Sequence, residues 1–167
     1  MNIFPRLIHQ IIALLLFCWI SSAVALEVGD ELLALDIDSS PMPFSYNPNG
    51  KSQLIVIYPL AYSSRKVGEF NNRVIEAGYC PKSIVDMMNR AWYAPIALAE
   101  KEIEKGIKTS PNPNCTVTSD YEGIANKHWG LKKGPVVIVV NGKGIVSFFH
   151  YGILTEAQEQ QVLELLK

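Results

Sequence analysis

Residues 134–167 read GPVVIVVNGKGIVSFFHYGILTEAQEQQVLELLK, and this stretch decides the predicted fold. The five consecutive aliphatic residues Val136 to Val140 are typical of a strand that is buried on both faces. Asn-Gly and Lys-Gly at 141–144 supply residues that accept positive φ, so the chain can reverse there. Residues 145–151 are β-branched and aromatic, which predicts a second strand. A Thr-x-x-Gln capping box at Thr155 precedes leucines at helical spacing and predicts a final helix.

This order of a proline, a strand, a hairpin, a strand and a helix resembles the carboxy-terminal half of the thioredoxin superfamily. In that superfamily the proline usually follows a cis peptide bond, and Pro135 matches it here. The resemblance implies an α/β, thioredoxin-like fold with a central mixed sheet flanked by helices. A shared fold does not by itself imply a shared activity.

The first 25 residues have the pattern of a secretory signal peptide. Arg6 gives a basic start, residues 11–20 are apolar, and Ala23-Val24-Ala25 is a small-x-small cleavage site. The apolar run is shorter than the roughly 20 residues of a membrane span, although a retained anchor is the alternative. We therefore predict a signal peptide over 1–25 that is cleaved after Ala25, and a thioredoxin-like domain over 26–167. The mature chain is then expected in the periplasm, without a membrane span.

The charge of the predicted mature part is nearly balanced. It has 14 basic and 16 acidic residues, a net charge of −2, because only Arg6 leaves with the signal peptide. This nearly balanced charge argues against nucleic acid or an anionic membrane surface as a partner. No phosphate-binding glycine loop and no metal-ligand spacing of Cys or His is present, so we expect no cofactor and no metal.

The remaining elements follow from apolar periodicity and from Gly, Pro and Asn punctuation. A short edge strand is expected within residues 26–38, and Phe44 and Tyr46 alternate with polar neighbours like a second one. Strands and helices then alternate: we predict a strand at 53–58, a helix from Ser63 or Ser64 to Gly78, a strand at 83–88, a helix at 95–105 ended by Gly106, a strand at 115–118 and a helix at 122–129. The segment 83–88 also fits a helix, and a strand is favoured because it continues the alternation.

In thioredoxins the first buried strand leads into a Cys-x-x-Cys motif at the start of the next helix, where the helix dipole lowers the thiol pKa. The equivalent turn here contains Tyr62, Ser63, Ser64 and Arg65 and no cysteine, which excludes a dithiol mechanism at this turn. Three interpretations of the turn compete. A serine caps the helix, Arg65 and Lys66 bind an anion beside it, or Ser63 is a nucleophile that a general base activates.

Cys80 and Cys115 are the two cysteines outside the predicted signal peptide, and they lie 35 positions apart. In an exported protein an even pair favours a structural disulfide. The alternatives are two separate buried thiols and a peroxidatic or exchange-active pair. Neither cysteine begins a predicted helix, and neither has a neighbour that would lower its pKa in a recognisable motif, so a structural role is the favoured interpretation.

Several segments together resemble the YtfJ-like family. They are the opening Val-Gly-Asp at 28–30, the cysteine-free turn at 62–66, EGIANKHWGL at 122–131 and GILTEAQEQQVLELL at 152–166. Members of that family are small periplasmic proteins of Gram-negative bacteria with a thioredoxin-like fold and no established biochemical activity. The resemblance supplies no catalytic residues.

From these observations we expect a non-catalytic binding or accessory protein of the periplasm. The superfamily resemblance implies that a protein or peptide partner docks around the cysteine-free turn and the loop before the proline, that is, at Tyr62, Ser63, Ser64, Arg65, Gly134 and Pro135. The alternative is a thiol-disulfide oxidoreductase or thiol peroxidase that uses Cys80 and Cys115.

Overall fold

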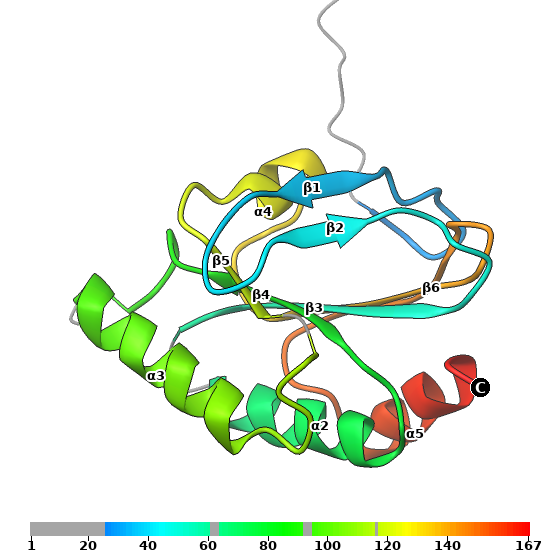
Figure 1. Cartoon of the computed structure of the whole chain (residues 1–167). Coiled ribbons are helices and arrows are strands. Elements are labelled where there is room, and N and C mark those ends of the chain that lie inside the picture. Colours follow the sequence, from blue (N-terminus) through cyan, green and yellow to red (C-terminus); the bar gives the residue numbers. More distant parts are fainter. Residues whose placement is uncertain (1–25, 61–63, 92–94, 116) are drawn as a thin grey trace, which may run out of the picture.

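A computed structural model describes residues 26–60, 64–91, 95–115 and 117–167 of the chain. Its centre is a five-stranded mixed sheet with the order β5-β4-β3-β6-β7 (Figure 1). Within this sheet β3, β4 and β5 are parallel to one another, whereas β6 and β7 run antiparallel to their neighbours. The strands are β3 (Gln53–Pro59), β4 (Lys82–Asp86), β5 (Val117–Asp120), β6 (Val136–Val140) and β7 (Val146–Tyr151).

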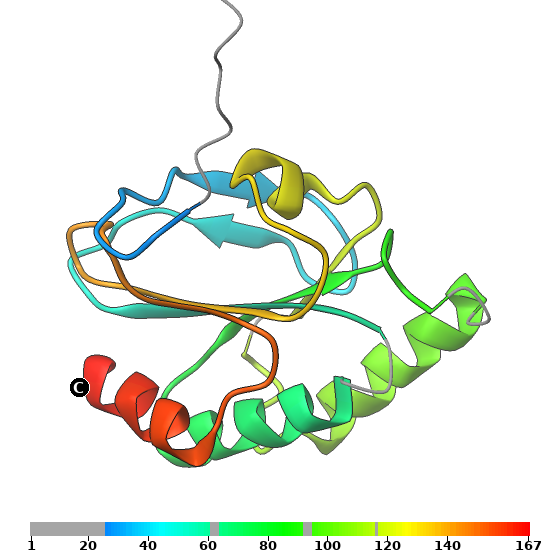
Figure 2. The same cartoon turned by 180° about the vertical axis from the view of Figure 1, so that it is seen from behind.

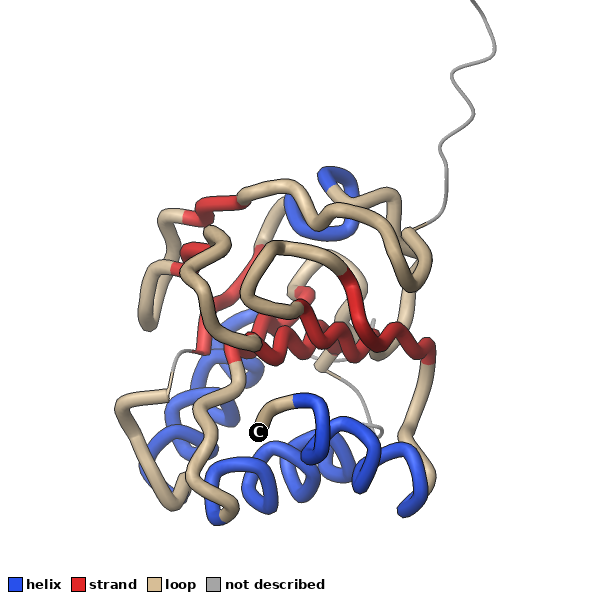
Figure 3. The backbone as a smooth tube through the Cα atoms, turned by 90° about the vertical axis from the view of Figure 1, so that its right-hand side faces the viewer, coloured by secondary structure: helices blue, strands red, loops and turns tan. Residues whose placement is uncertain are grey.

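The two faces of the sheet are covered differently. Three helices, α2 (Ser64–Glu76), α3 (Ile96–Thr109) and α5 (Glu156–Leu165), lie on one face (Figures 1 and 2). The other face carries α4 (Ile124–His128) and a small antiparallel sheet of β1 (Leu35–Ile37) and β2 (Phe44–Tyr46). The edge-on view in Figure 3 shows these layers. The predicted α/β, thioredoxin-like fold is therefore confirmed.

The continuous apolar runs of the central strands are explained by this double cover. Because side chains alternate along a strand, Leu54 and Val56 face α2 and α5, while Ile55 and Ile57 face the β1–β2 layer. All four are at most 2% exposed. A strand that is buried on both faces has no position for a polar side chain in its middle, which is why the sequence shows no alternation there.

The ends of two helices form as predicted. Gly78, at φ 92°, ends α2, and the amides of Gly78 and Tyr79 donate to the carbonyl oxygens of Ile75 and Val74. At the start of α5, Thr155 and Gln158 form the reciprocal capping box. No helix in the described part of the chain is long and apolar enough to cross a membrane.

The structure corrects three details of the sequence-based prediction. Helix α3 does not stop at Gly106 but continues to Thr109, because Ile103 and Ile107 pack in the apolar cluster beneath it. Strand β5 begins at Val117, two residues after Cys115. The superfamily resemblance also implied a cis bond before Pro135, but among the described residues the only cis peptide bond joins Ser40 and Pro41. The chain turns into β6 at Gly134, whose φ of 128° a residue with a side chain rarely adopts.

Candidate functional site

The cysteine-free turn lies between β3 and α2. Tyr62 and Ser63 are outside the described residues, and Ser64 is the first residue of α2. The exposed side chain of Arg65 pairs along its own helix, with 3.1 Å from its Nε to Oε1 of Glu69. The interpretations of Ser63 as a helix cap or as a nucleophile, and of an anion site here, stay predictions.

Gly134 and Pro135 lie at the end of the sheet where β3 ends. Val136, the first residue of β6, is opposite Ile57 near the carboxyl end of β3, so the preceding loop is close to the end of that strand. The loop before β6 therefore lies at the end of the sheet where β3 ends. Docking of a protein or peptide there stays a prediction.

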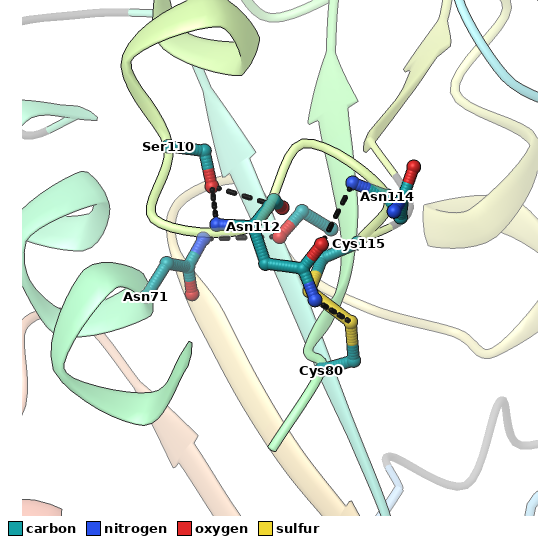
Figure 4. Close-up of a disulfide and its surroundings, with 7 residues drawn as sticks. Asn71, Cys80, Ser110, Asn112, Asn114 and Cys115 are labelled. Carbon is teal, nitrogen blue, oxygen red and sulfur yellow. Dashed lines mark hydrogen bonds between the residues drawn. A yellow bond between two sulfur atoms is a disulfide. The ribbon is translucent and has the colours of Figure 1, made fainter. Parts of the chain in front are cut away.

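The two cysteines form a disulfide, which confirms one of the pairings considered from sequence (Figure 4). The Cys80–Cys115 bond has an S–S distance of 2.00 Å, and the two Cα atoms are 5.2 Å apart. Cys80 lies just before β4 and Cys115 just before β5. The disulfide thus lies at the amino ends of β4 and β5. Because both strands are parallel to β3, this is the opposite end of the strands from the carboxyl end of β3, which leads toward α2.

Sheet register explains why residues 35 positions apart meet. Ser83 of β4 is opposite Val117 of β5, and adjacent parallel strands lie roughly 4.8 Å apart. Cys80 is three residues before Ser83, and Cys115 is two residues before Val117. The chain therefore enters two neighbouring strands from the same side, which brings the two cysteines into bonding range.

The loop from Ser110 to Cys115 is held by its own hydrogen bonds. The amide of Asn112 donates to Oγ of Ser110 over 3.3 Å, and the amide of Cys115 donates to the carbonyl oxygen of Asn112 over 3.2 Å. The amide of Asn114 donates to Oδ1 of Asn112 over 3.0 Å. The other end of this side chain points at the disulfide, with Nδ2 donating to Sγ of Cys80 over 3.9 Å (Figure 4).

The two sulfur-bearing residues differ in their surroundings. Cys80 is exposed, whereas Cys115 is only 5% exposed. The disulfide therefore joins an exposed residue to a buried residue.

A groove of about 590 Å³ lies beside the buried end of the disulfide. Its lining includes Cys115 and Asn112 at one end and Tyr58 and Leu60, near the carboxyl end of β3, at the other. Asn71 of α2 also lines it and is 9% exposed. Nδ2 of Asn71 donates to Oγ of Ser83 over 3.0 Å, while its Oδ1 is buried without a partner.

Sequence reasoning did not identify Asn112 or Asn71. The segment 109–114 reads as a Pro/Asn loop and has no motif that would point to a sulfur contact. Only the pairing of the two cysteines places Asn112 against Sγ. Within the described ranges, no group of three or more His, Cys, Asp or Glu side chains is arranged to hold a metal ion.

The family model described as "Bacterial protein of unknown function (YtfJ_HI0045)" matches residues 71–167 of the chain. This covers more than half of the chain, including both cysteines and the final hairpin and helix. The match confirms the resemblance that the sequence suggested.

Two curated relatives carry the name thiol:disulfide interchange protein DsbE, from Xylella fastidiosa strains 9a5c and Temecula1. They are 38% identical over 53 residues and 36% identical over 56 residues. These matches cover 32% and 33% of this chain, and 25% and 28% of the relatives. The matched part thus spans about a quarter of each curated relative.

Solved structures resemble the whole described domain. A Chlorobium tepidum protein, provisionally named thiol:disulfide interchange protein DsbE, has a TM-score of 0.64 and 18% identity, with 85% of this chain and 99% of that chain covered. A peroxiredoxin-like protein from Aquifex aeolicus has a TM-score of 0.58 and 17% identity, with 84% and 88% covered. At such identities the likeness establishes the thioredoxin-like fold alone.

The expectation of a non-catalytic binding or accessory protein is wrong. Its basis was the missing Cys-x-x-Cys at the turn before α2. The sequence similarity to thiol:disulfide interchange proteins, together with the disulfide between Cys80 and Cys115, contradicts it and supports the alternative of redox function. The cysteine pair of this chain does not lie within one helical turn, because Cys80 and Cys115 lie just before two neighbouring strands.

Proposed function

This chain belongs to the YtfJ_HI0045 family, and we propose that it is a thiol-disulfide oxidoreductase whose redox pair is Cys80 and Cys115. The observation that carries the proposal is a disulfide with one exposed and one buried cysteine. The similarity to thiol:disulfide interchange proteins supports the same class of chemistry.

The asymmetry of the pair assigns a role to each cysteine. An incoming thiolate attacks Sγ of Cys80, the Cys80–Cys115 bond breaks, and the sulfur of Cys115 leaves as a thiolate that takes a proton from water. Cys80 then holds the substrate in a mixed disulfide. A second thiolate of the substrate then attacks the substrate sulfur of the mixed disulfide, and Cys80 leaves as a thiolate. The substrate dithiol becomes a disulfide, and two electrons and two protons pass to the protein.

The reverse direction uses the same atoms. In the reduced protein the thiolate of Cys80 attacks a substrate disulfide, and Cys115 resolves the mixed disulfide by attacking Sγ of Cys80. Which direction prevails depends on the reduction potential of the pair relative to its compartment.

We also propose that the protein acts in the periplasm. The support is the signal-peptide pattern of residues 1–25, and disulfide chemistry belongs in an oxidising compartment. Amino-terminal sequencing of protein recovered from the periplasmic fraction should give a chain that begins at Leu26. Recovery of uncleaved protein in the membrane fraction would contradict this part of the proposal.

The test of the redox function is thiol exchange on the folded protein. In every sample Cys18→Ser leaves Cys80 and Cys115 as the only cysteines. The oxidised protein is mixed with dithiothreitol or with a peptide dithiol in buffer without denaturant. Exchange is stopped by acid at timed intervals, and free thiols are alkylated and counted by mass. We expect both thiols to appear while the circular dichroism spectrum stays that of the folded protein.

Two single variants serve as matched controls for the assigned roles. Cys115→Ser leaves the exposed thiol without its resolving partner. When this variant is mixed with the oxidised peptide, the Cys80 thiolate should attack the peptide disulfide, expel one peptide sulfur as a thiolate and accumulate as a mixed disulfide. Cys80→Ser leaves only the buried thiol and should accumulate little. The proposal is overturned if the native disulfide resists the reductants and opens only in denaturant, or if the two variants trap peptide equally.

A further inference from the structure

We propose that Asn112 is a catalytic residue of this exchange, because its side-chain amide donates a hydrogen bond that stabilises the thiolate of Cys80. The inference rests on the proposed function, since it concerns the same pair of cysteines. The contact that carries it joins Nδ2 of Asn112 to Sγ of Cys80 over 3.9 Å (Figure 4). Asn112 thereby touches the atom at which the mixed disulfide forms and breaks.

The amide is held in place before any substrate arrives. Oδ1 of Asn112 accepts the amide of Asn114, which fixes the plane of the side chain and turns Nδ2 toward the sulfur. The backbone of Asn112 is fixed as well, by bonds to Ser110 and to the amide of Cys115. None of these bonds uses a sulfur atom, so the loop keeps its donor in position when the disulfide opens.

A donor at this position acts on the charged form of the cysteine. Sγ of Cys80 carries a negative charge whenever it is the attacking or the leaving group, and it is uncharged in the disulfide. A hydrogen bond to a charged acceptor is roughly twice as strong as one to a neutral acceptor. Asn112 therefore stabilises the thiolate more than the disulfide or the thiol, and it lowers the pKa of the Cys80 thiol.

The structure supplies a matched pair of variants in the same loop. Asn112→Asp keeps an oxygen to accept the amide of Asn114 but replaces the donor near Sγ with a negative charge. Asn114→Asp introduces the same charge two residues away, where the amide of Asn114 still donates to Asn112 and the donor to Sγ is untouched. Both are made in the Cys115→Ser background with Cys18→Ser, so that Cys80 is the only thiol.

The measurement is the rate of iodoacetamide alkylation of Cys80 from pH 5 to pH 10. We expect Asn112→Asp to raise the pKa of the Cys80 thiol by about one unit, which lowers the thiolate fraction near neutral pH by about tenfold. Asn112→Ala should shift the profile in the same direction by less, and Asn114→Asp should leave it within about twofold. Urea unfolding of each variant checks that the loop change leaves the domain folded.

The outcomes separate this inference from the proposed function. If Asn112→Asp and Asn114→Asp give the same alkylation profile while the wild-type disulfide still exchanges, Asn112 has no such role and the redox function stands. If the profile shifts as expected but the native disulfide never exchanges with dithiothreitol, the hydrogen bond is real and the redox function fails.

Discussion

Cys80 and Cys115 join the amino ends of β4 and β5, two neighbouring parallel strands of the central sheet. The disulfide thus lies at the opposite end of the strands from the start of α2 at Ser64. The disulfide depends on two separate segments being brought together by the sheet. The disulfide can therefore form only when this part of the sheet is folded. Its removal should lower the stability of the domain.

The disulfide should stabilise the domain by closing a loop of 35 residues. Loop-closure entropy predicts that the double change Cys80→Ser with Cys115→Ser lowers the free energy of unfolding by about 4 kcal/mol. Urea denaturation of the oxidised protein and of the double variant measures this loss. Dithiothreitol should lower the stability of the wild-type protein by a similar amount and leave the double variant unchanged. An equal effect of dithiothreitol on both proteins would contradict the prediction.

Asp120, 1% exposed at the end of β5, should be needed for the short helix α4. Its Oδ1 and Oδ2 accept the amides of Ile124 and Ala125, each over 2.9 Å. Asp120→Ala removes the acceptor of the buried bond from Ala125 and of the part-buried bond from Ile124, and should lower the free energy of unfolding by about 2 kcal/mol. Asp38→Ala, at an exposed position, is the control and should stay within about 0.5 kcal/mol of the wild type. A loss equal to that of the control would refute the capping role.

Tyr58 on β3 should make the protein less stable at alkaline pH. Burial raises the pKa of its phenol to about 12, because the phenolate is poorly solvated there. In the unfolded chain the pKa is about 10. Between these values the folded protein keeps a proton that the unfolded chain has lost, so stability is complete below pH 10 and falls as the pH rises toward 12.

This effect is measured as the difference in the free energy of unfolding between the wild type and Tyr58→Phe, which lacks the phenolic hydroxyl. Between pH 9 and pH 11 the stability advantage of the wild type over Tyr58→Phe should fall by about 1.3 kcal/mol. Urea unfolding at the two pH values gives both differences. A difference that does not change with pH would show that Tyr58 titrates as it does in water.

Gly142 should be the least replaceable glycine of the β6–β7 hairpin. A Cβ at this position would lie 2.5 Å from the carbonyl oxygen of Gly50, and backbone cannot move aside as a flexible side chain can. Gly142→Ala should therefore cost at least about 1 kcal/mol. Gly106→Ala is the matched control, because a Cβ there meets nothing within 4 Å and lies inside α3. That change should stabilise the protein by about 0.5–1 kcal/mol, so equal losses in the two variants would contradict the argument.

Much of the fold could be predicted because its signals are local. The apolar run of β6, the capping box at Thr155 and the terminating Gly78 each act within a few residues, and each forms as expected. The end of α3 was misplaced because tertiary packing of Ile103 and Ile107 outweighs the weak helix propensity of Gly106. Local preference gave the wrong boundary where a buried contact competed with it.

The candidate site was predicted only in part. The sequence offered Cys80 and Cys115 as a pair but could not say that one is exposed and the other buried. It gave no reason to single out Asn112, whose contact with Sγ joins residues 32 positions apart. The Cys-x-x-Cys motif of the thioredoxin resemblance directs attention to the turn before α2, whereas the two cysteines of this chain lie at the other end of the strands.

The sequence by itself determined the elements and the fold class, because hydrophobic period, caps and turns are properties of neighbouring residues. Only the tertiary structure decided the site. The parallel pairing of β4 with β5 sets the distance between Cys80 and Cys115, and the packing of the sheet decides which sulfur solvent can reach. Both are long-range outcomes of the sheet register, and no short motif in this chain encodes them.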